Sequence, residues 1–250
     1  MSSLHISQVE SYVKETMANS GTSILVVGHD FKHVDRVRNW ALRIAKGEGF
    51  QNLELLEIAA LLHDIGLPCT SAEALRHLHA LIGAEMAADF LAKNNLAMDE
   101  ERDTVVHAIR YHNAAPSAVP GLTAEDREDR VLAWSDVSTL SERSALLRIL
   151  RDADALDAIG ALGLMRAFTS KSFKPEYDPA NVRGDTWGLS SDGFDERFAE
   201  GLGIGDYIVN QINFQISYYD NLITEAAREI ARPLVEFMKS FVLQLEAEIT

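Results

Sequence analysis

The chain has 250 residues, almost half of them apolar, and a formal net charge of −15. A chain of this length can bury one substantial hydrophobic core, so a single enzyme-sized domain is the simplest expectation. The negative charge argues against broad contacts with nucleic acid or an anionic membrane, because both need a basic surface. A phosphate-bearing substrate would therefore have to meet local positive charge.

The sequence favours a reducing compartment. Its single cysteine, Cys69, excludes an intramolecular disulfide. The first residues lack the basic-then-apolar pattern of a secretory signal, and no window approaches the ~20 apolar residues of a membrane span. We therefore expect a cytoplasmic protein that binds neither membranes nor nucleic acid.

Helical periodicity dominates from about residue 6 to residue 169. An apolar stripe at positions 34, 37, 41 and 44 predicts a helix that ends at Gly47 and Gly49. The next run, 53–65, is apolar on most faces and stops at a Gly-Leu-Pro sequence. It predicts a buried central helix with His63 and Asp64 in its last turn.

Three further helical regions follow before residue 169. Thr70 and Glu73 form a capping box that predicts the start of a helix reaching about residue 93. Residues 99–112 predict another helix. From 144 to 168 the apolar spacing is again helical, and two internal glycines indicate a bend or a close helix contact.

The last third of the chain changes character. Residues 170–205 are rich in Gly, Pro, Ser, Asp and aromatics, which predicts a long irregular loop of a kind that is uncommon unless it is functional. Helical spacing returns over 206–249, with Pro233 as a kink or break. We therefore predict an all-α fold: one domain over 1–250, with a helical core of about 22–169 and a C-terminal helical extension. The oligomeric state stays open, because the last helix could pack on its own core or on a second subunit through Leu234, Phe237, Phe241 and Leu245.

Histidines are concentrated in one part of the chain, since seven of the eight lie between His29 and His112. The tightest element is the adjacent pair His63-Asp64, because neighbours on a helix project about 100° apart and can both bend toward one ion at the helix end. A ring nitrogen and a carboxylate together suit divalent ions. By itself such a dipeptide is more often a surface or capping pair.

The position of this pair strengthens the metal interpretation. His63 and Asp64 end an otherwise apolar helix, and burying an ionised carboxylate is costly unless a cation or donors compensate. His33 lies on the preceding amphipathic helix, and Asp154 lies within a later apolar helix where a carboxylate is equally unexpected. Four such groups from three helices would form a metal site with open positions for water and substrate.

The series His33, His63-Asp64 and Asp154 resembles the motif series of the HD-domain superfamily. One thinly characterised bacterial subfamily of HD hydrolases also resembles this chain at residues 28–33, 165–168, 177–179 and 224–231. The resemblance implies an HD-domain helical bundle and metal-dependent hydrolysis of a phosphate ester or anhydride, with nucleotides the usual substrates. One departure is Leu67, where many members place a lysine, so no cation carries over from that position.

His79 and His112 resemble the extra histidines of HD proteins that hold two metals. In those proteins the aspartate of the pair, here Asp64, bridges the ions. The alternatives are that His79 decorates an exposed helix face and that His112 caps a helix. One or two ions per chain therefore both stay open, as does their identity among Mn, Fe, Zn, Ni, Co and Mg.

The other histidines of this stretch are assigned no ligand role. His107 lies five residues before His112 and projects about 140° from it on a helix, so it should not reach the same ion. His29 and His77 are assigned to structural support, such as hydrogen bonds behind the ligands.

In the mechanism that we expect, water activated at the metal attacks phosphorus, and Asp64 is the central ligand. Arg36 lies one turn beyond His33 on the same helical face, so its guanidinium could bind a phosphate at the metal, with an ordinary surface arginine as the equal alternative. Lys174, in the irregular loop, is a weaker candidate for substrate binding, because charged loop residues are usually just solvated. The proton donor to the leaving group is not identifiable from the sequence.

Two rival functions remain at this point. A diiron oxygenase of the HD type would require iron with both His79 and His112 as ligands. A non-catalytic nucleotide-binding protein could keep the fold, but such a protein has no need for buried carboxylates. Our expectation is hydrolysis of a small phosphorylated metabolite, most simply a nucleotide.

Overall fold

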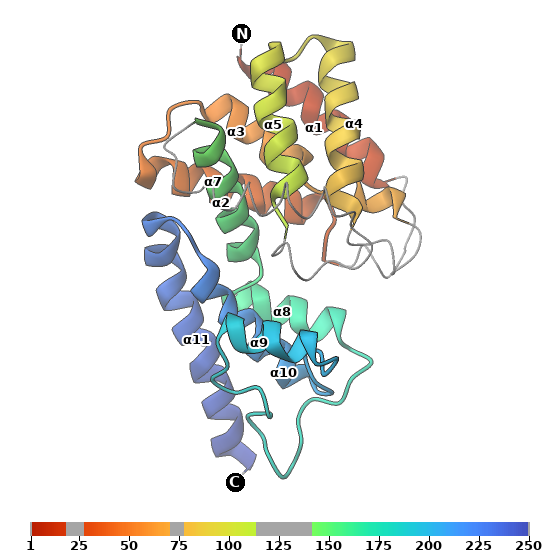
Figure 1. The fold of residues 1–250 in the computed structure, drawn as a ribbon. Helices are drawn as coiled ribbons and strands as arrows, with labels where there is room; N and C mark the ends of the chain where they lie inside the picture. The colour runs from red at the N-terminus through yellow and green to blue at the C-terminus, as the bar shows by residue number, and fades with distance from the viewer. Residues whose placement is uncertain (1, 19–27, 71–77, 114–141, 250) are drawn as a thin grey trace. The chain divides into compact units, whose positions relative to one another are not determined.

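The structure is a computed structural model that describes residues 2–18, 28–70, 78–113 and 142–249 (Figure 1). Within these ranges it contains helices, turns and connections but no β-strand, apart from one isolated bridge between Asp178 and Asn181. The all-α prediction is therefore confirmed. The chain divides into two compact units, Met1–Ala153 and Asp154–Thr250, which are described separately, and the prediction of a single domain stays a prediction.

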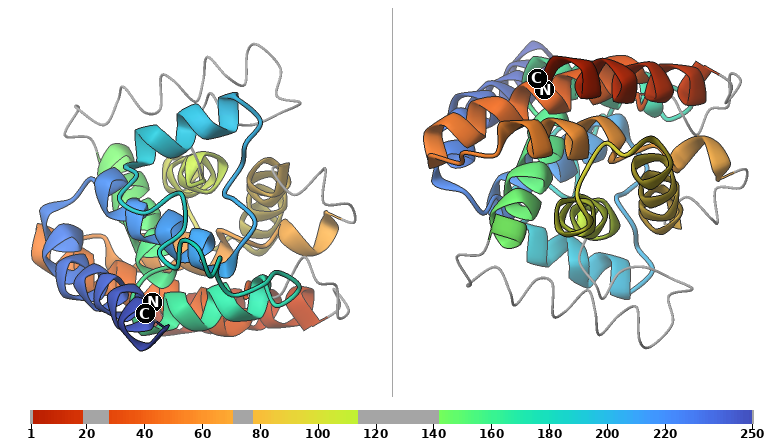
Figure 2. Two further views of the ribbon diagram at one scale, coloured as in Figure 1. Left: turned by 90° about the horizontal axis from the view of Figure 1, so that it is seen from below. Right: turned by 90° about the horizontal axis from the view of Figure 1, so that it is seen from above.

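The first unit is built around a central helix. Its elements are α1 (Ser2–Ala18), α2 (Phe31–Glu48), α3 (Leu53–Leu62), the 3₁₀ turn η2 (Leu67–Cys69), α4 (His79–Asn94), α5 (Asp99–Tyr111) and the first part of α7 (Glu142–Asp157). Helix α3 packs against α1, α2 and α5 and buries most of its residues, as predicted. Helices α4 and α5 pack side by side, which Figure 2 shows nearly end-on.

Short polar side chains and glycines set the ends of the helices that lead to the histidines. Asp30 caps α2, because its Oδ1 accepts hydrogen bonds from the backbone N–H groups of Lys32 and His33 at 3.1 and 3.2 Å. Gly49, with φ 68°, ends the same helix, as the glycines predicted. The predicted apolar face of α2 is fully buried: Val34, Val37, Ala41 and Ile44.

Two predicted boundaries differ or cannot be compared. Helix α3 ends at Leu62, so His63 is its C-terminal cap and Asp64 lies in the following turn rather than in the helix. The predicted helix start at Thr70 and Glu73 falls partly outside the described residues. The Thr70 hydroxyl donates to the Leu67 carbonyl at 2.7 Å and so closes the η2 turn.

The second unit contains the end of α7 and the helices α8 (Gly160–Ser170), α9 (Ser191–Ala199), α10 (Ile208–Ser217), η6 (Tyr218–Asn221) and α11 (Glu225–Ile249). The predicted bend separates α7 from α8, where Gly160 has φ 73° and donates its N–H to the sulfur of Met238 at 3.0 Å. Arg166 fixes the end of α7, because its Nη1 donates to the buried carboxylate of Asp157 at 2.9 Å.

The prediction of an irregular loop over 170–205 is wrong in part, because residues 191–199 form α9. Ser190 caps this helix by accepting from the N–H of Gly193 at 3.3 Å. Phe194 is fully buried, and its ring lies 5.0 Å from that of Phe214 on α10. A helix of nine residues has little stability of its own, so packing rather than local periodicity determines it.

Three buried neutral side chains, Asn210, Asn213 and Thr186, tie the preceding segment to α10, and we call them the amide network. Asn210 donates to the Asp185 carboxylate at 2.6 Å and to the Thr186 hydroxyl at 2.9 Å. Asn213 donates to the same hydroxyl at 3.1 Å and to the Arg183 carbonyl at 2.8 Å. The segment 183–186 is therefore fixed by side-chain hydrogen bonds in the absence of regular structure.

Helix α11 runs through Pro233 without a break. The proline removes one backbone hydrogen bond. The buried face of the helix compensates by packing Ala227, Ala231, Val235, Met238 and Val242. In the part of the chain that the structure describes, no helix combines the length and apolar character needed to cross a membrane.

Candidate metal centre

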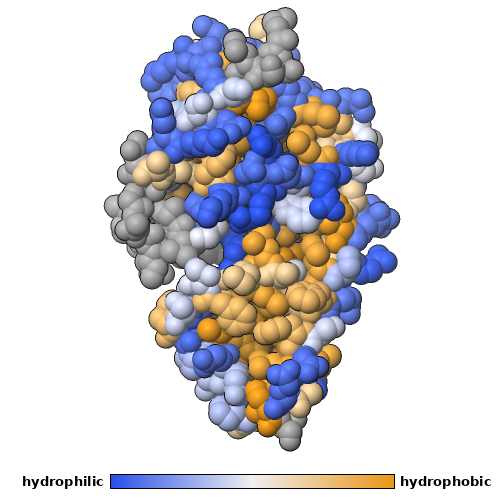
Figure 3. Space-filling model, turned by 180° about the vertical axis from the view of Figure 1, so that it is seen from behind, coloured by the Kyte–Doolittle hydropathy of each residue, from blue (hydrophilic) through white to orange (hydrophobic). Residues whose placement is uncertain are grey.

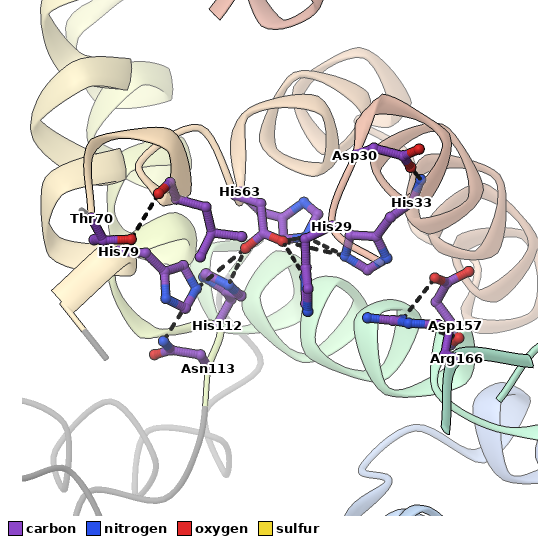
Figure 4. A network of polar contacts seen from close by, with 12 residues as sticks. His29, Asp30, His33, His63, Thr70, His79, His112, Asn113, Asp157 and Arg166 are labelled. Atoms are coloured by element: carbon purple, nitrogen blue, oxygen red, sulfur yellow. Dashed lines mark hydrogen bonds and ion pairs between the residues drawn. The ribbon is translucent and has the colours of Figure 1, made fainter. Parts of the chain in front are cut away.

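Five histidines of the first unit lie close together (Figure 4), and the Asp64 carboxylate lies among them. We call Asp64 and these five residues the histidine cluster: His29, His33, His63, His79 and His112. They come from five places in the chain, namely the segment before α2, α2 itself, the end of α3, the start of α4 and the end of α5. Most members are buried, whereas the side chains of His29 and His79 are 23% and 13% exposed.

The two carboxylate oxygens of Asp64 face different histidines. Three ring nitrogens lie 3.0, 3.4 and 3.5 Å from Oδ2: His29 Nδ1, His33 Nε2 and His63 Nε2. Two lie 3.2 and 3.6 Å from Oδ1: His79 Nε2 and His112 Nε2. Asp64 therefore has an Oδ2 side with three ring nitrogens and an Oδ1 side with two. This arrangement is expected of a ligand that bridges two ions.

Backbone carbonyls fix the tautomers of two buried rings. His63 caps α3 and donates from Nδ1 to the Ala60 carbonyl at 2.8 Å. His112 caps α5 and donates from Nδ1 to the Ile109 carbonyl at 2.6 Å. A neutral ring protonated at Nδ1 carries its lone pair on Nε2, and in both residues Nε2 is the atom near Asp64. Metal-ligating histidines are oriented in the same way.

The spacing of these atoms fits a divalent ion. His112 Nε2 is buried and has no hydrogen-bond partner among the described residues. His33 Nε2 and His63 Nε2 lie only 3.3 Å apart, so a proton or a cation must separate their lone pairs. Ligands about 2.1 Å from one ion lie roughly 3.0–3.5 Å from one another. The cluster shows this spacing, and an ion would satisfy its carboxylate and its ring nitrogens together.

The electrostatics of the cluster favour the protonation states that bind metals. Burial would raise the pKa of the Asp64 carboxyl, but the surrounding imidazoles, His63 most strongly, hold this pKa well below its usual range. Burial lowers the pKa of His112, so this ring stays neutral at a pH where an exposed histidine is protonated. An ionised carboxylate and neutral imidazoles are the forms that ligate metals.

A close backbone contact places His79. The turn after Asp64 approaches α4 so closely that a Cβ on Gly66 would lie 2.2 Å from the His79 carbonyl oxygen and 2.6 Å from the Gly83 nitrogen. Only glycine fits there. His79 Nε2 also lies 3.4 Å from Asn113 Nδ2, which follows His112. The glycine after the His-Asp pair therefore has a packing role that brings the start of α4 to the site.

Three further residues were predicted to belong to the site: Asp154, Arg36 and Lys174. Asp154 is half-buried on α7 and belongs to the second unit, so its role as a ligand stays a prediction. Arg36 is half-buried on α2, one turn after His33, and its contact with phosphate also stays a prediction. Lys174 donates to the Gly205 carbonyl within the second unit, a contact that supports a structural role.

His107 and His77 add nothing to the described cluster. His107 lies apart from it, where its ring contacts Tyr111 and its Nδ1 lies 2.7 Å from an Arg143 guanidinium nitrogen. His77 lies outside the described residues.

His29 lies where a supporting residue is expected. Its Nδ1 lies 3.0 Å from Asp64 Oδ2, and its ring lies edge-on to that of His33, with centroids 4.8 Å apart. This contact agrees with the supporting hydrogen bond that the sequence analysis assigned to His29. Asp30 explains the position, because a residue directly before a helix cap lies beside the first turn of that helix.

Comparison with known protein families gives the class of protein. The HD domain family matches residues 30–159, which is more than half of the chain, so the chain belongs to the HD domain family. HD domains bind divalent metals, and the fold is that of metal-dependent phosphohydrolases in general.

Relatives share this fold over nearly the full length. Bacillus subtilis YpgQ, an uncharacterised protein, is 25% identical over 250 residues, which cover 97% of this chain and 92% of YpgQ. The structure of YpgQ in complex with ADP superposes with a TM-score of 0.57 at 23% identity, covering 99% and 97% of the two chains. An HD-superfamily hydrolase from Bacillus thuringiensis gives a TM-score of 0.61 at 24% identity, covering 99% and 98%.

Proposed function

We propose that this protein hydrolyses a phosphate ester or anhydride bond of a nucleotide, with divalent metal as cofactor. The observation that carries the proposal is the placement of Asp64 between two sets of ring nitrogens. The family supports metal-dependent hydrolysis of phosphates. The YpgQ complex with ADP supports a nucleotide as the substrate class.

The cluster would hold two ions in this proposal. His33, His63, Asp64 and Asp154 would hold one ion, and Asp64, His79 and His112 would hold the second. A bound divalent ion supplies a water of lowered pKa and positive charge for the phosphoryl oxygens. The backbone carbonyls of Ala60 and Ile109 keep two of the rings in the ligating tautomer.

Residues outside the ligand set would orient the carboxylate and the substrate. His29 would donate from Nδ1 to Asp64 Oδ2 and so hold the carboxylate in place. Arg36 would bind the phosphoryl oxygens, because it lies one turn after His33 on α2 and a guanidinium matches the geometry of two such oxygens. Lys174 stays the weaker candidate, since it would first have to leave the Gly205 carbonyl.

The test is a metal add-back assay. Purified protein is stripped of metal, given manganese, iron, zinc, nickel, cobalt or magnesium singly, and assayed for phosphate and pyrophosphate released from a nucleotide panel. We expect turnover that depends on metal and is abolished in Asp64→Ala, while the matched His107→Ala variant keeps it, because His107 lies outside the cluster.

The same assay distinguishes the proposal from its alternatives. Loss of turnover in His79→Ala as well would support two ions. Turnover with magnesium would exclude a diiron oxygenase, because magnesium has no redox chemistry. Nucleotide binding without release of phosphate or pyrophosphate under any metal would contradict the proposal and favour a non-catalytic nucleotide-binding protein.

A further inference from the structure

The ends of α3 and α5 repeat one local arrangement. Each helix is capped by a histidine, His63 or His112, whose Nδ1 donates to the backbone carbonyl three residues earlier. Both caps keep helical backbone angles, with φ and ψ of −56° and −39° at His63 and of −67° and −31° at His112. The next residue carries a side-chain oxygen in both places, Asp64 after His63 and Asn113 after His112. Since Asp64 lies among the ring nitrogens of the cluster, Asn113 should present its side chain to the same site from α5.

The Asn113 carboxamide does reach the site (Figure 4). The side chain is half-buried, and its Nδ2 lies 3.4 Å from His79 Nε2. The same His79 nitrogen lies 3.2 Å from Asp64 Oδ1. Asn113 therefore contacts the atom through which His79 would hold the second ion.

This contact has to change when His79 binds a metal. An amide N–H has a hydrogen to offer and no lone pair, so it can face His79 Nε2 only while that nitrogen keeps its own lone pair. An ion at Nε2 would take the lone pair, and the N–H of Asn113 would then point its hydrogen at a cation. The oxygen of the same carboxamide suits this place better, because it is an acceptor with two lone pairs.

A half-turn of the carboxamide brings this oxygen to the ion without repacking. Nδ2 and Oδ1 of Asn113 have nearly the same size and bond geometry, so a half-turn about the Cβ–Cγ bond puts Oδ1 close to the present place of Nδ2. Its separation from His79 Nε2 would then stay near 3.4 Å. Two ligands of one ion lie roughly 3.0–3.5 Å apart. Asparagine carbonyl oxygens are ordinary ligands of divalent ions.

We propose that Asn113 Oδ1 is a ligand of the second ion, together with Asp64, His79 and His112. The inference deepens the proposed function and rests on its two-ion arrangement. The ligand set would hold two ring nitrogens and two oxygens, whereas without Asn113 the nitrogens would predominate. Oxygen ligands suit manganese and magnesium, and imidazole suits zinc and nickel. Asn113 therefore shifts the preference of the second site toward manganese and away from zinc.

The test is calorimetric titration of the metal-free, intact protein with Mn²⁺ in the absence of substrate. Wild type should bind two ions, and His112→Ala identifies the second of them as the one that it loses. Asn113→Leu keeps the size of the side chain but has no oxygen, so it should weaken the second ion at least about 10-fold. Asn113→Asp puts a charged oxygen in the same place and should tighten the second ion at least about 10-fold. The first ion should keep its affinity in both variants.

The sign of the Asn113→Asp effect separates a ligand from a supporting hydrogen bond. If Asn113 acted by donating from Nδ2 to His79, aspartate would have no N–H to offer, and both variants would weaken the second ion. A loss of affinity in both variants would therefore overturn the proposal. A second ion whose affinity neither variant changes would also overturn it, and in both cases the two-ion site would stand.

Added negative charge needs its own control, because it attracts a cation without ligating it. Hydrophilic side chains gather over the first unit on the face that Figure 3 shows, and charges in contact with water are screened. Arg110 is half-buried on α5, three residues before Asn113, and Arg110→Gln changes the net charge by the same amount as Asn113→Asp without adding an oxygen ligand. It should change the affinity for the second Mn²⁺ less than about 3-fold. A tightening equal to that of Asn113→Asp would overturn the ligand role.

Titration with Zn²⁺ tests the metal preference. Asn113→Leu should weaken Zn²⁺ at the second site less than Mn²⁺, because the two histidines that remain suit zinc. An equal loss for both metals would overturn the preference for manganese. A wild-type protein that binds a single ion would overturn the two-ion site of the proposed function and the role of Asn113 together. Circular dichroism checks that each variant folds, and Asn113→Asp decides by its sign if Asn113→Leu does not fold.

Discussion

Among the described residues, each unit buries a cluster of polar side chains, and these two clusters are built differently. The amide network of the second unit is neutral, and its side chains donate at 2.6–3.1 Å, the range of ordinary hydrogen bonds. The histidine cluster of the first unit is ionisable, and its nitrogens surround Asp64 at 3.0–3.6 Å. The first kind of cluster fixes a loop through ordinary hydrogen bonds, whereas the second has a spacing that fits an ion.

The largest effect is expected when the charge at Asp64, the centre of the histidine cluster, is removed. Asp64→Asn keeps the shape of the side chain but removes the anionic bridge, so we expect both ions to be lost and turnover to fall about 10³-fold. Metal content by elemental analysis and turnover on the best nucleotide give the answer. A variant that keeps its metal would show that Asp64 is not the central ligand.

A ligand on the Oδ1 side of Asp64 can be removed without changing the ligands on the Oδ2 side. His112→Ala should reduce the metal content from two ions to one and turnover by about 10²-fold, because the Oδ2 side keeps its own ligands. His107→Ala is the matched control on the same helix, since it contacts Arg143 and Tyr111 instead. Equal metal content in His112→Ala and wild type would place the second ion elsewhere or exclude it.

Breaking the amide network should cost stability and leave the metal untouched. Asn210→Ala removes the donor to Asp185 and Thr186 and should lower the free energy of unfolding by about 2 kcal/mol. Urea denaturation measures this change, and Asn221→Ala, at an exposed position, serves as the control. If Asn210→Ala also lowered metal affinity, the separation between the two clusters would fail.

The smallest expected effect is on the pH dependence of stability, to which the histidine cluster contributes and the amide network does not. In metal-free protein the pKa of His112 is lowered, so the unfolded chain takes up this proton at a higher pH than the folded chain does. Stability should therefore fall as pH drops below about 6.5, the ordinary histidine value. Asp64 adds nothing between pH 7 and 5, because its lowered pKa matters only below the ordinary carboxyl range.

Thermal unfolding between pH 7 and pH 5 measures this effect. Comparison of wild type with His112→Gln isolates one ring from the other histidines, and the variant should lose less stability on acidification. If the stability of wild type and of His112→Gln changed identically with pH, burial could not be lowering the pKa of His112. The amide network has no titratable side chain, so it should contribute nothing to the change of stability with pH.

Sequence periodicity was enough for helices with a strong apolar face and clear end signals. The helix predicted at 99–112 is α5, Asp99–Tyr111, and the glycine at the end of α2 was found correctly. Helix α9 was missed because one capping serine and one buried phenylalanine, Phe194, determine it through packing. Such contacts leave no periodic signal in the chain.

The site shows a similar limit. The motif series indicated His63 and Asp64, and His79 and His112 were named as their candidate companions. The division of the histidines between the two oxygens of Asp64 could not be predicted, because it depends on the turn that follows α3 and on its contact with α4 at Gly66.

Both α3 and α5 end at the histidine cluster, since His63 and His112 are their C-terminal caps. The carboxyl end of a helix carries roughly half a negative charge from its aligned peptide dipoles. Two such ends and the Asp64 carboxylate sum to about −2, and Asp154 as a ligand would make the sum about −3. One divalent ion would leave the centre negative or neutral, whereas two would make it positive. A protein with a net charge of −15 would thus attract a phosphate only after its second ion has bound.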